Sequence, residues 1–181
     1  MALIQISDFK GEVAITKTSY NSDDVQTYID NTSKEVLRKL MGDKLYSEYL
    51  ADLDGNGDPQ TQKFIDLVDG KTYENSCGRT VIYEGLKKFL LYFIWHDYQL
   101  GIIYKNAGAG THRQDNENSN KPSWYQLSSE AKRVHDKGVP YFKSAWRFIY
   151  EFRSTYFPDD EADWTYKPIY KKSKLITKTI Q

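Results

Sequence analysis

The segment from Val81 to Tyr104, "VIYEGLKKFLLYFIWHDYQLGIIY", constrains the fold more than any other part of the chain. Between Phe89 and Trp95 it is apolar nearly all round, which is typical of a helix that its neighbours surround. That apolar run has seven residues, far fewer than the roughly 20 that span a bilayer. We therefore predict a mainly α fold without membrane contact, a helical bundle around a central apolar helix at about 81–104.

Helical periodicity also marks the segments on both sides of this helix. An apolar stripe starts after Ser22, a capping residue, and stops before Gly42, which can close a helix. The stripe consists of Val25, Tyr28, Ile29, Val36, Leu37, Leu40 and Met41. A second short helix is predicted from Asp43, with Leu45, Tyr46, Tyr49, Leu50 and Leu53 on one side.

Two further helices are predicted. One runs from Pro59 to Asp69, with Asp58 as its cap and Gly70 as its end. The other covers about 124–156 and should break or kink at Pro140, because proline removes an amide donor from the helix.

The remaining segments lack a helical period. We predict one or two short extended segments in the first twenty residues, a turn at 71–80 and a flexible loop at 105–123. The last stretch, residues 164–181, contains five lysines and no acid, and we interpret it as an extended basic C-terminal arm after a helical domain of residues 1–163. That domain carries 20 basic against 25 acidic side chains and is mildly acidic.

Cellular location is constrained by the single cysteine and by the N-terminus. Cys77 has no partner for an internal disulfide, which suits a reducing compartment. The N-terminus "MALIQISDFKGE" lacks a basic region and reaches Asp8 too early for a secretory signal. We expect a soluble protein made inside the cell.

"DLDGNGDPQTQK", residues 52–63, resembles a calcium loop but has Lys63 where such a loop needs a bidentate glutamate. A turn between two helices explains it better. "DGKT" at 69–72 lacks the first glycine and the preceding strand of a P-loop. We therefore predict no metal site and no cofactor.

A catalytic site has little support. The three histidines, His96, His112 and His135, lie far apart in the sequence. His96 beside Asp97 could act as a general base, although a histidine satisfied within the core is the simpler interpretation. We expect a protein without enzymatic activity.

Aromatic residues are abundant, with 15 Tyr, 4 Trp and 8 Phe. Those in helical stripes belong to the core, whereas aromatic side chains in irregular segments need another surface to pack on. Together with the arm lysines, these form the predicted partner interface: Tyr73, Trp164, Tyr166, Lys167, Tyr170, Lys171, Lys172 and Lys174.

The order of parts resembles the head-tail connector, or head-completion adaptor, family of tailed bacteriophages, including ring proteins of crAss-like phages. The matching features are "ISDFKGEVAI", the L-x-x-L-[LM]-G-x-x-L-Y pattern at Leu37–Tyr46, "FIDLVDGKTYENSCGRTVIYEGLKKFLLYFIWHDY" and "SAWRFIYEF". They cover most of residues 4–157 as a pattern of hydrophobic and turn positions, and they include no active-site residue.

The resemblance implies a structural virion protein at the portal vertex or neck, present in the host cytoplasm during assembly. Identical subunits would form a ring, with a dodecamer as the expected size, between the portal protein and the tail or further connector proteins. Genomic DNA would pass through its channel without sequence-specific binding. The alternative is a nucleic-acid-binding helical protein that uses the Lys/Tyr-rich tail on phosphates and bases.

Overall fold

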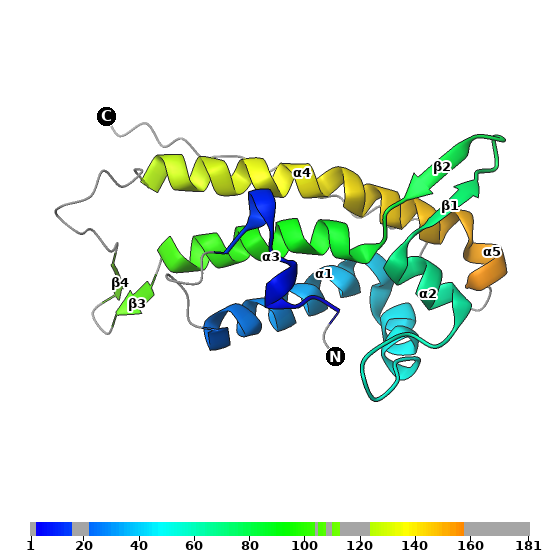
Figure 1. The fold of residues 1–181 in the computed structure, drawn as a ribbon, viewed down its shortest axis with the longest axis horizontal. Coiled ribbons are helices and arrows are strands. Elements are labelled where there is room, and N and C mark those ends of the chain that lie inside the picture. Colours follow the sequence, from blue (N-terminus) through cyan, green and yellow to red (C-terminus); the bar gives the residue numbers. More distant parts are fainter. Residues whose placement is uncertain (1–2, 16–21, 104, 108–109, 113–123, 158–181) are drawn as a thin grey trace.

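The computed structural model describes residues 3–15, 22–103, 105–107, 110–112 and 124–157. Three long helices lie side by side: α1 (Ser22–Ala51), α3 (Leu86–Ile103) and α4 (Trp124–Glu151). The short helix α2 (Gln62–Asp69), the strands β1 (Lys71–Glu74) and β2 (Thr80–Tyr83), and the final turn α5 (Arg153–Tyr156) gather at one end (Figure 1). The predicted mainly α bundle with a central helix is confirmed.

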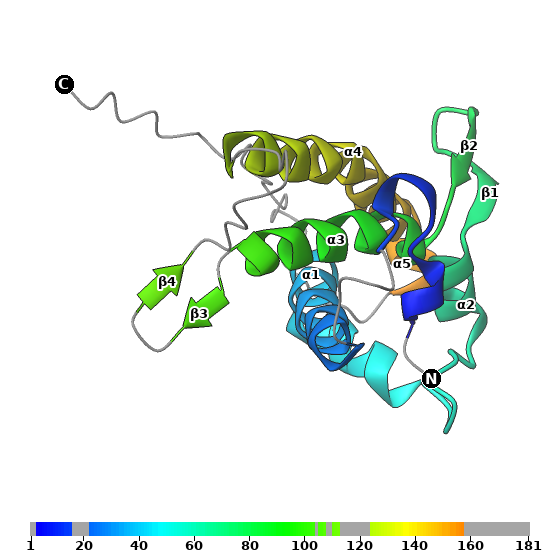
Figure 2. The ribbon, with the colours of Figure 1, turned by 60° about the vertical axis from the view of Figure 1, so that its left-hand side comes forward.

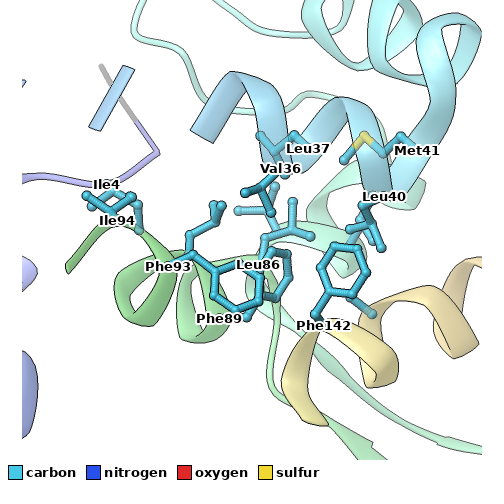
Figure 3. Packing of buried hydrophobic residues seen from close by; sticks show 14 of the residues in the cluster. Ile4, Val36, Leu37, Leu40, Met41, Leu86, Phe89, Phe93, Ile94 and Phe142 are labelled. Atoms are coloured by element: carbon cyan, nitrogen blue, oxygen red, sulfur yellow. The ribbon is translucent and has the colours of Figure 1, made fainter. Parts of the chain in front are cut away.

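The central helix is α3, which packs against both α1 and α4. Leu86, Phe89, Leu90, Phe93 and Ile94 are all buried, none of them more than 1% exposed. Figure 3 shows Leu86 and Phe89 of α3 between the apolar stripe of α1 and Phe142 of α4. Each large side chain buried in this way contributes roughly 1.5 to 3 kcal/mol, so this layer accounts for much of the stability.

The central helix starts later than predicted. It begins at Leu86, because residues 80–83 form β2 and Gly85, with φ of 81°, turns the chain between strand and helix. Tyr83 therefore belongs to the hairpin described below, although its side chain is buried.

Gly42 divides α1, as predicted. Its φ of 75° and ψ of 169° are not helical and interrupt the run from Ser22 to Ala51. The predicted stripe is buried on both sides of this kink, from Val25 and Ile29 to Leu45 and Tyr49. Leu50 was assigned to the buried side and is instead 48% exposed, so the helix turns its last apolar residue outward.

The start of α2 differs from the prediction. Asp58 does not cap the helix and Pro59 does not open it, because Pro59 forms an isolated bridge with Leu53 and the helix begins at Gln62. Asp52 stabilises the entry instead: its Oδ2 accepts the amides of Gln60 at 2.9 Å and Thr61 at 3.0 Å. Gly70 closes the helix as expected.

Two β-hairpins lie where no strand was predicted, the first across the predicted turn and the start of the predicted central helix. In the first, β1 pairs antiparallel with β2 in a register that joins Lys71 to Tyr83 and Glu74 to Thr80. In the second, β3 (Lys105–Ala107) pairs with β4 (Gly110–His112) inside the predicted loop of 105–123. Each strand has only three or four residues, too few for alternation to stand out in the sequence.

Pro140 does not break α4, which continues from Trp124 to Glu151. A proline inside a helix costs about 3 kcal/mol. Buried side chains on both sides of it, including Val134, Phe142 and Phe148, oppose that cost by packing onto the bundle.

The N-terminal segment forms two single turns of 3-10 helix, η1 (Ile6–Asp8) and η2 (Gly11–Val13), where only extended segments were predicted. The residues that flank each turn are extended, and Ile4, Phe9 and Val13 are buried. Figure 2 shows this segment lying across α3. Among the described residues, no helix is both long and apolar enough to cross a membrane.

Candidate interaction surface

The hairpin β1–β2 has one face on the core and one face in solvent. On the inner face, the Tyr73 ring lies 5.6 Å from Phe148 and 5.2 Å from Phe152, and Tyr83 stacks on Phe148 at 4.7 Å. The outer face carries Thr72, Glu74, Thr80 and Ile82, all exposed. Ile82 is 71% exposed, an unusual position for an isoleucine in a strand.

Both ends of this hairpin are held in place. At its base, Gly70 (φ 93°) and Gly85 (φ 81°) approach so closely that a Cβ on Gly70 would lie 2.3 Å from the Tyr83 carbonyl oxygen. At its tip, Asn75 Oδ1 accepts the amide of Arg79 at 2.9 Å, and Glu151 of α4 accepts the amide of Ser76. The outer face is therefore presented on a fixed support.

Large hydrophobic side chains that are exposed in the described residues concentrate at the hairpin end of the molecule. They are Ile82 in β2, Leu50 in the last turn of α1 and Tyr150 in the last turn of α4. Figure 1 shows β2 and the C-terminal ends of α1 and α4 in this half of the molecule, with the end of α1 on the opposite side from β2. Tyr150 stacks on Trp146 at 5.3 Å and carries the Arg153 guanidinium 4.0 Å above its ring. Trp, Tyr and Arg are the residue types most enriched at binding hot spots.

A buried carboxylate joins α2, β1 and α5 at the same end. Asp66, 7% exposed, accepts Lys71 Nζ at 2.6 Å and the Tyr156 hydroxyl at 2.8 Å on Oδ2, and Gln62 Nε2 at 2.7 Å on Oδ1. Burial opposes ionisation of Asp66, but the hydrogen bonds, with Lys71 foremost, outweigh it and lower the pKa. The same bond to Asp66 raises the pKa of Lys71, so both groups are charged at neutral pH.

This network, which we call the Asp66 cluster (Gln62, Asp66, Lys71 and Tyr156), fixes where the described part of the chain ends. Tyr156 donates to Asp66 and lies 2.9 Å from Lys71 Nζ. The next residue, Phe157, is 3% exposed and packs against Phe64 at 6.3 Å. The described chain therefore ends beside Lys71, the first residue of β1.

Of the predicted interface residues, the structure describes only Tyr73. It lies in a regular strand, so the assignment to an irregular segment that placed it at the interface was wrong, and its ring packs on its own core. The other seven residues, Trp164, Tyr166, Lys167, Tyr170, Lys171, Lys172 and Lys174, lie outside the described residues. The exposed Ile82 was not predicted, because the segment that contains it was read as the start of the central helix.

His96 and Asp97 form a structural link between helices. Asp97 Oδ1 lies 2.8 Å from His96 Nδ1, and Oδ2 accepts the Thr32 hydroxyl of α1 at 2.9 Å. The His96 ring lies 4.8 Å from the His135 ring of α4. Burial and the neighbouring His96 lower the pKa of His135, against the opposing effect of Asp136. With both carboxylate oxygens engaged, Asp97 orients His96 and connects α1 to α3.

Beside Asp97 lies an open groove of about 600 Å³, lined by Asp24, Thr27, Tyr28, Asn31, Thr32, Glu35, Asp97 and Leu100. Within the described ranges, no group of three or more His, Cys, Asp or Glu side chains could hold a metal ion. The groove is acidic, with Asp24, Glu35 and Asp97 in its lining.

The segment of residues 52–63 uses its acidic side chains for its own backbone. Asp54 Oδ1 accepts the amides of Asn56 at 2.8 Å and Asp58 at 2.9 Å, and the Asp58 amide is the main cause of a lowered pKa at Asp54. Asp52 binds the amides before α2, and Lys63 pairs with Glu48 at 3.3 Å. These contacts are those of a helix-to-helix turn.

The fold and this surface define a mainly helical domain that presents, at one end, a fixed hairpin whose outer face exposes Ile82 among polar side chains. The chain belongs to the family of unknown function DUF6712, whose model matches residues 37–171, or 135 of the 181 residues. No curated protein and no solved structure matches it.

Proposed function

We propose that the chain is a structural virion protein, one of the identical subunits of a ring between the portal and the tail of a tailed bacteriophage. The observation that supports this best is the hairpin, where Ile82 is exposed on strands held at both ends, and Leu50 and Tyr150 are exposed in the same half of the molecule. A rigid surface with exposed apolar side chains is typical of a protein that assembles with others. The order of parts resembles that of head-tail connectors over most of residues 4–157. This resemblance is the reason for proposing the portal-to-tail ring as the assembly.

The charge distribution is consistent with this role. An acidic body of residues 1–163, with 20 basic against 25 acidic side chains, suits a channel that DNA passes without adhering. The five lysines of the arm could dock on an acidic surface of the portal or of a neighbouring subunit. The role requires no catalytic residue, metal or cofactor.

The decisive experiment locates the chain in purified particles. Antibodies against the chain, visualised by electron microscopy, should label virions at the neck, and native mass measurement of neck complexes should return a multimer. Absence of the chain from virions, or labelling elsewhere on them, would refute the proposal. A free monomer in solution would not, because such proteins can assemble only on the portal.

Binding to free DNA separates this proposal from the nucleic-acid-binding alternative. A connector should bind short duplexes weakly, whereas a protein that uses the lysine-rich tail on phosphates should bind them with a steep dependence on salt. Deletion of residues 164–181 should abolish such binding under the alternative. Under the connector proposal, the same deletion should leave the monomer folded and impair attachment to particles.

A further inference from the structure

The β1–β2 hairpin has edges that are open to a further strand. Within the described residues, β1 pairs only with β2, and no other backbone hydrogen bond involves residues 71–74 or 80–83. Proteins usually protect such edges with charge, proline or a covering segment, because an open edge pairs readily with another strand. In this hairpin, β2 bears the exposed Ile82. The close approach of Gly70 and Gly85 holds the base of the hairpin, and Glu151 holds its tip. The edge is preorganised for strand addition.

The arm contains a segment suited to this edge. Residues 174–180, "KLITKTI", consist mostly of β-branched and aliphatic residues, which favour strands. As a strand, the segment would place Leu175, Thr177 and Thr179 on one face and Ile176, Lys178 and Ile180 on the other. Apolar side chains on both faces match the hairpin, which carries Tyr73 and Val81 inside and Ile82 outside. Lys174 and Lys178 also complement the exposed Glu74.

The length of the connection indicates which copy receives the segment. The described chain ends at Phe157, next to Tyr156, which contacts Lys71 at the start of β1. Pairing with its own hairpin would need only a short loop of a few residues. Residues 158–173 intervene instead, and an extended chain over that interval reaches up to about 55 Å. A domain of this size is only about 40 Å across, judged from the usual scaling of its radius of gyration.

We infer that residues 174–180 of one copy add as an extra strand to the β1–β2 hairpin of a second copy. This inference rests on the proposed assembly of identical subunits, and it names the contact that joins them. Successive arms would each bind the next hairpin, which is the heterologous arrangement that closes into rings.

Site-specific disulfide trapping in the full chain tests this contact. Cys77 lies exposed in the hairpin turn and supplies one thiol. Lys174→Cys and Thr179→Cys, made separately, place a second thiol at either end of the arm segment. Because a disulfide needs Cα atoms within about 7 Å, a paired strand brings only one of the two positions to the turn. We expect one variant to form intermolecular disulfides at least tenfold more than the other, and Cys77→Ser to abolish them.

A proline pair supplies the matched control. Thr177→Pro removes an amide from the middle of the added strand and should abolish the selective cross-link, whereas Thr165→Pro, outside the segment, should preserve it. Equal yields at both positions, a cross-link confined within single chains, or insensitivity to Thr177→Pro would overturn the inference. Neck labelling of virions together with any of these results would leave the proposed function standing and remove only the arm contact. A selective cross-link in a chain absent from virions would do the reverse.

Discussion

Replacing Asp66 by asparagine tests whether the Asp66 cluster holds the end of the bundle together. The substitution keeps the shape of the side chain and one acceptor for Gln62, but it removes the charge that binds Lys71 and the Tyr156 hydroxyl at 2.6 and 2.8 Å. A hydrogen bond to a charged group is worth about 1.5 to 3 kcal/mol. The Lys71 side chain is about one-third exposed, so water can solvate its ammonium group in the variant. Loss of the ion pair with Lys71 therefore costs less free energy than loss of a fully buried pair would.

We therefore expect Asp66→Asn to lower the free energy of unfolding by about 2 to 4 kcal/mol. For a chain of this length, that corresponds to a fall in Tm of roughly 4 to 16 °C. Chemical denaturation measures the free energy directly. Hydrogen exchange should show reduced protection in α5, because Tyr156 loses its acceptor while the central packing of α3 persists.

The chain provides a matched control. Asp30 on α1 also accepts a hydrogen bond from a glutamine four residues earlier, Gln26 Nε2 at 2.9 Å. It is exposed, however, and within the described part of the chain no hydrogen bond or ion pair joins it to a lysine or a tyrosine. Asp30→Asn should change stability by less than about 0.5 kcal/mol. Equal small losses in both variants would refute the reasoning.

The pH dependence provides a second check on the same residue. The pKa of Asp66 is lower in the folded chain than its ordinary value of 3.8, so its contribution is present above that value. The contribution is lost as the pH falls through the folded-state pKa. The gap in stability between the wild-type chain and Asp66→Asn should therefore be constant near neutral pH and shrink below about pH 4.

Three further predictions follow from the fold. Gly70→Ala should cost about 2 kcal/mol or more in chemical denaturation, because of its positive φ and the nearby Tyr83 carbonyl, whereas Gly55→Ala, whose Cβ meets no atom within 4 Å, should be nearly neutral; equal effects would contradict this. Leu90→Ala and Phe93→Ala should each cost about 2 to 5 kcal/mol, and an unchanged unfolding midpoint in both would show that α3 is not central. Since burial lowers the pKa of His135, stability should fall as the pH drops below about 6.5, and His135→Gln should flatten that slope between pH 7 and 5; an unaltered slope would refute the assignment.

The long helices could be predicted because each buries a wide stripe. The apolar residues from Val25 to Met41 recur at helical spacing, and those from Phe89 to Trp95 form an unbroken apolar run; the structure buries most of both sets. The hairpin could not be predicted in the same way, because a strand of four residues shows the alternation of buried and exposed side chains only twice. Gly70 and Gly85 were the available signal: two glycines that flank a short β-branched stretch, each needed where the backbones meet.

The Asp66 cluster could not be predicted from the sequence for a different reason. Asp66 and Tyr156 are 90 positions apart, and no local pattern relates them. The only hint was an acidic residue inside the otherwise apolar run of residues 64–68, in which Phe64, Leu67 and Val68 are buried. A carboxylate on a buried surface requires partners, but the tertiary fold alone determines which ones.

The Asp66 cluster joins α5, at the end of the described chain, to the base of the hairpin. Three apolar side chains of similar volume would stabilise this junction as well as an ion pair does, and often better. An apolar contact, however, allows α5 to settle in several orientations, whereas a carboxylate bound by Lys71, Tyr156 and Gln62 accepts one geometry. Since Lys71 opens β1 and Tyr156 ends α5, that geometry holds the end of the described chain against the base of the hairpin. The carboxylate therefore contributes a defined orientation at this end of the bundle, which an apolar contact of equal strength would not supply.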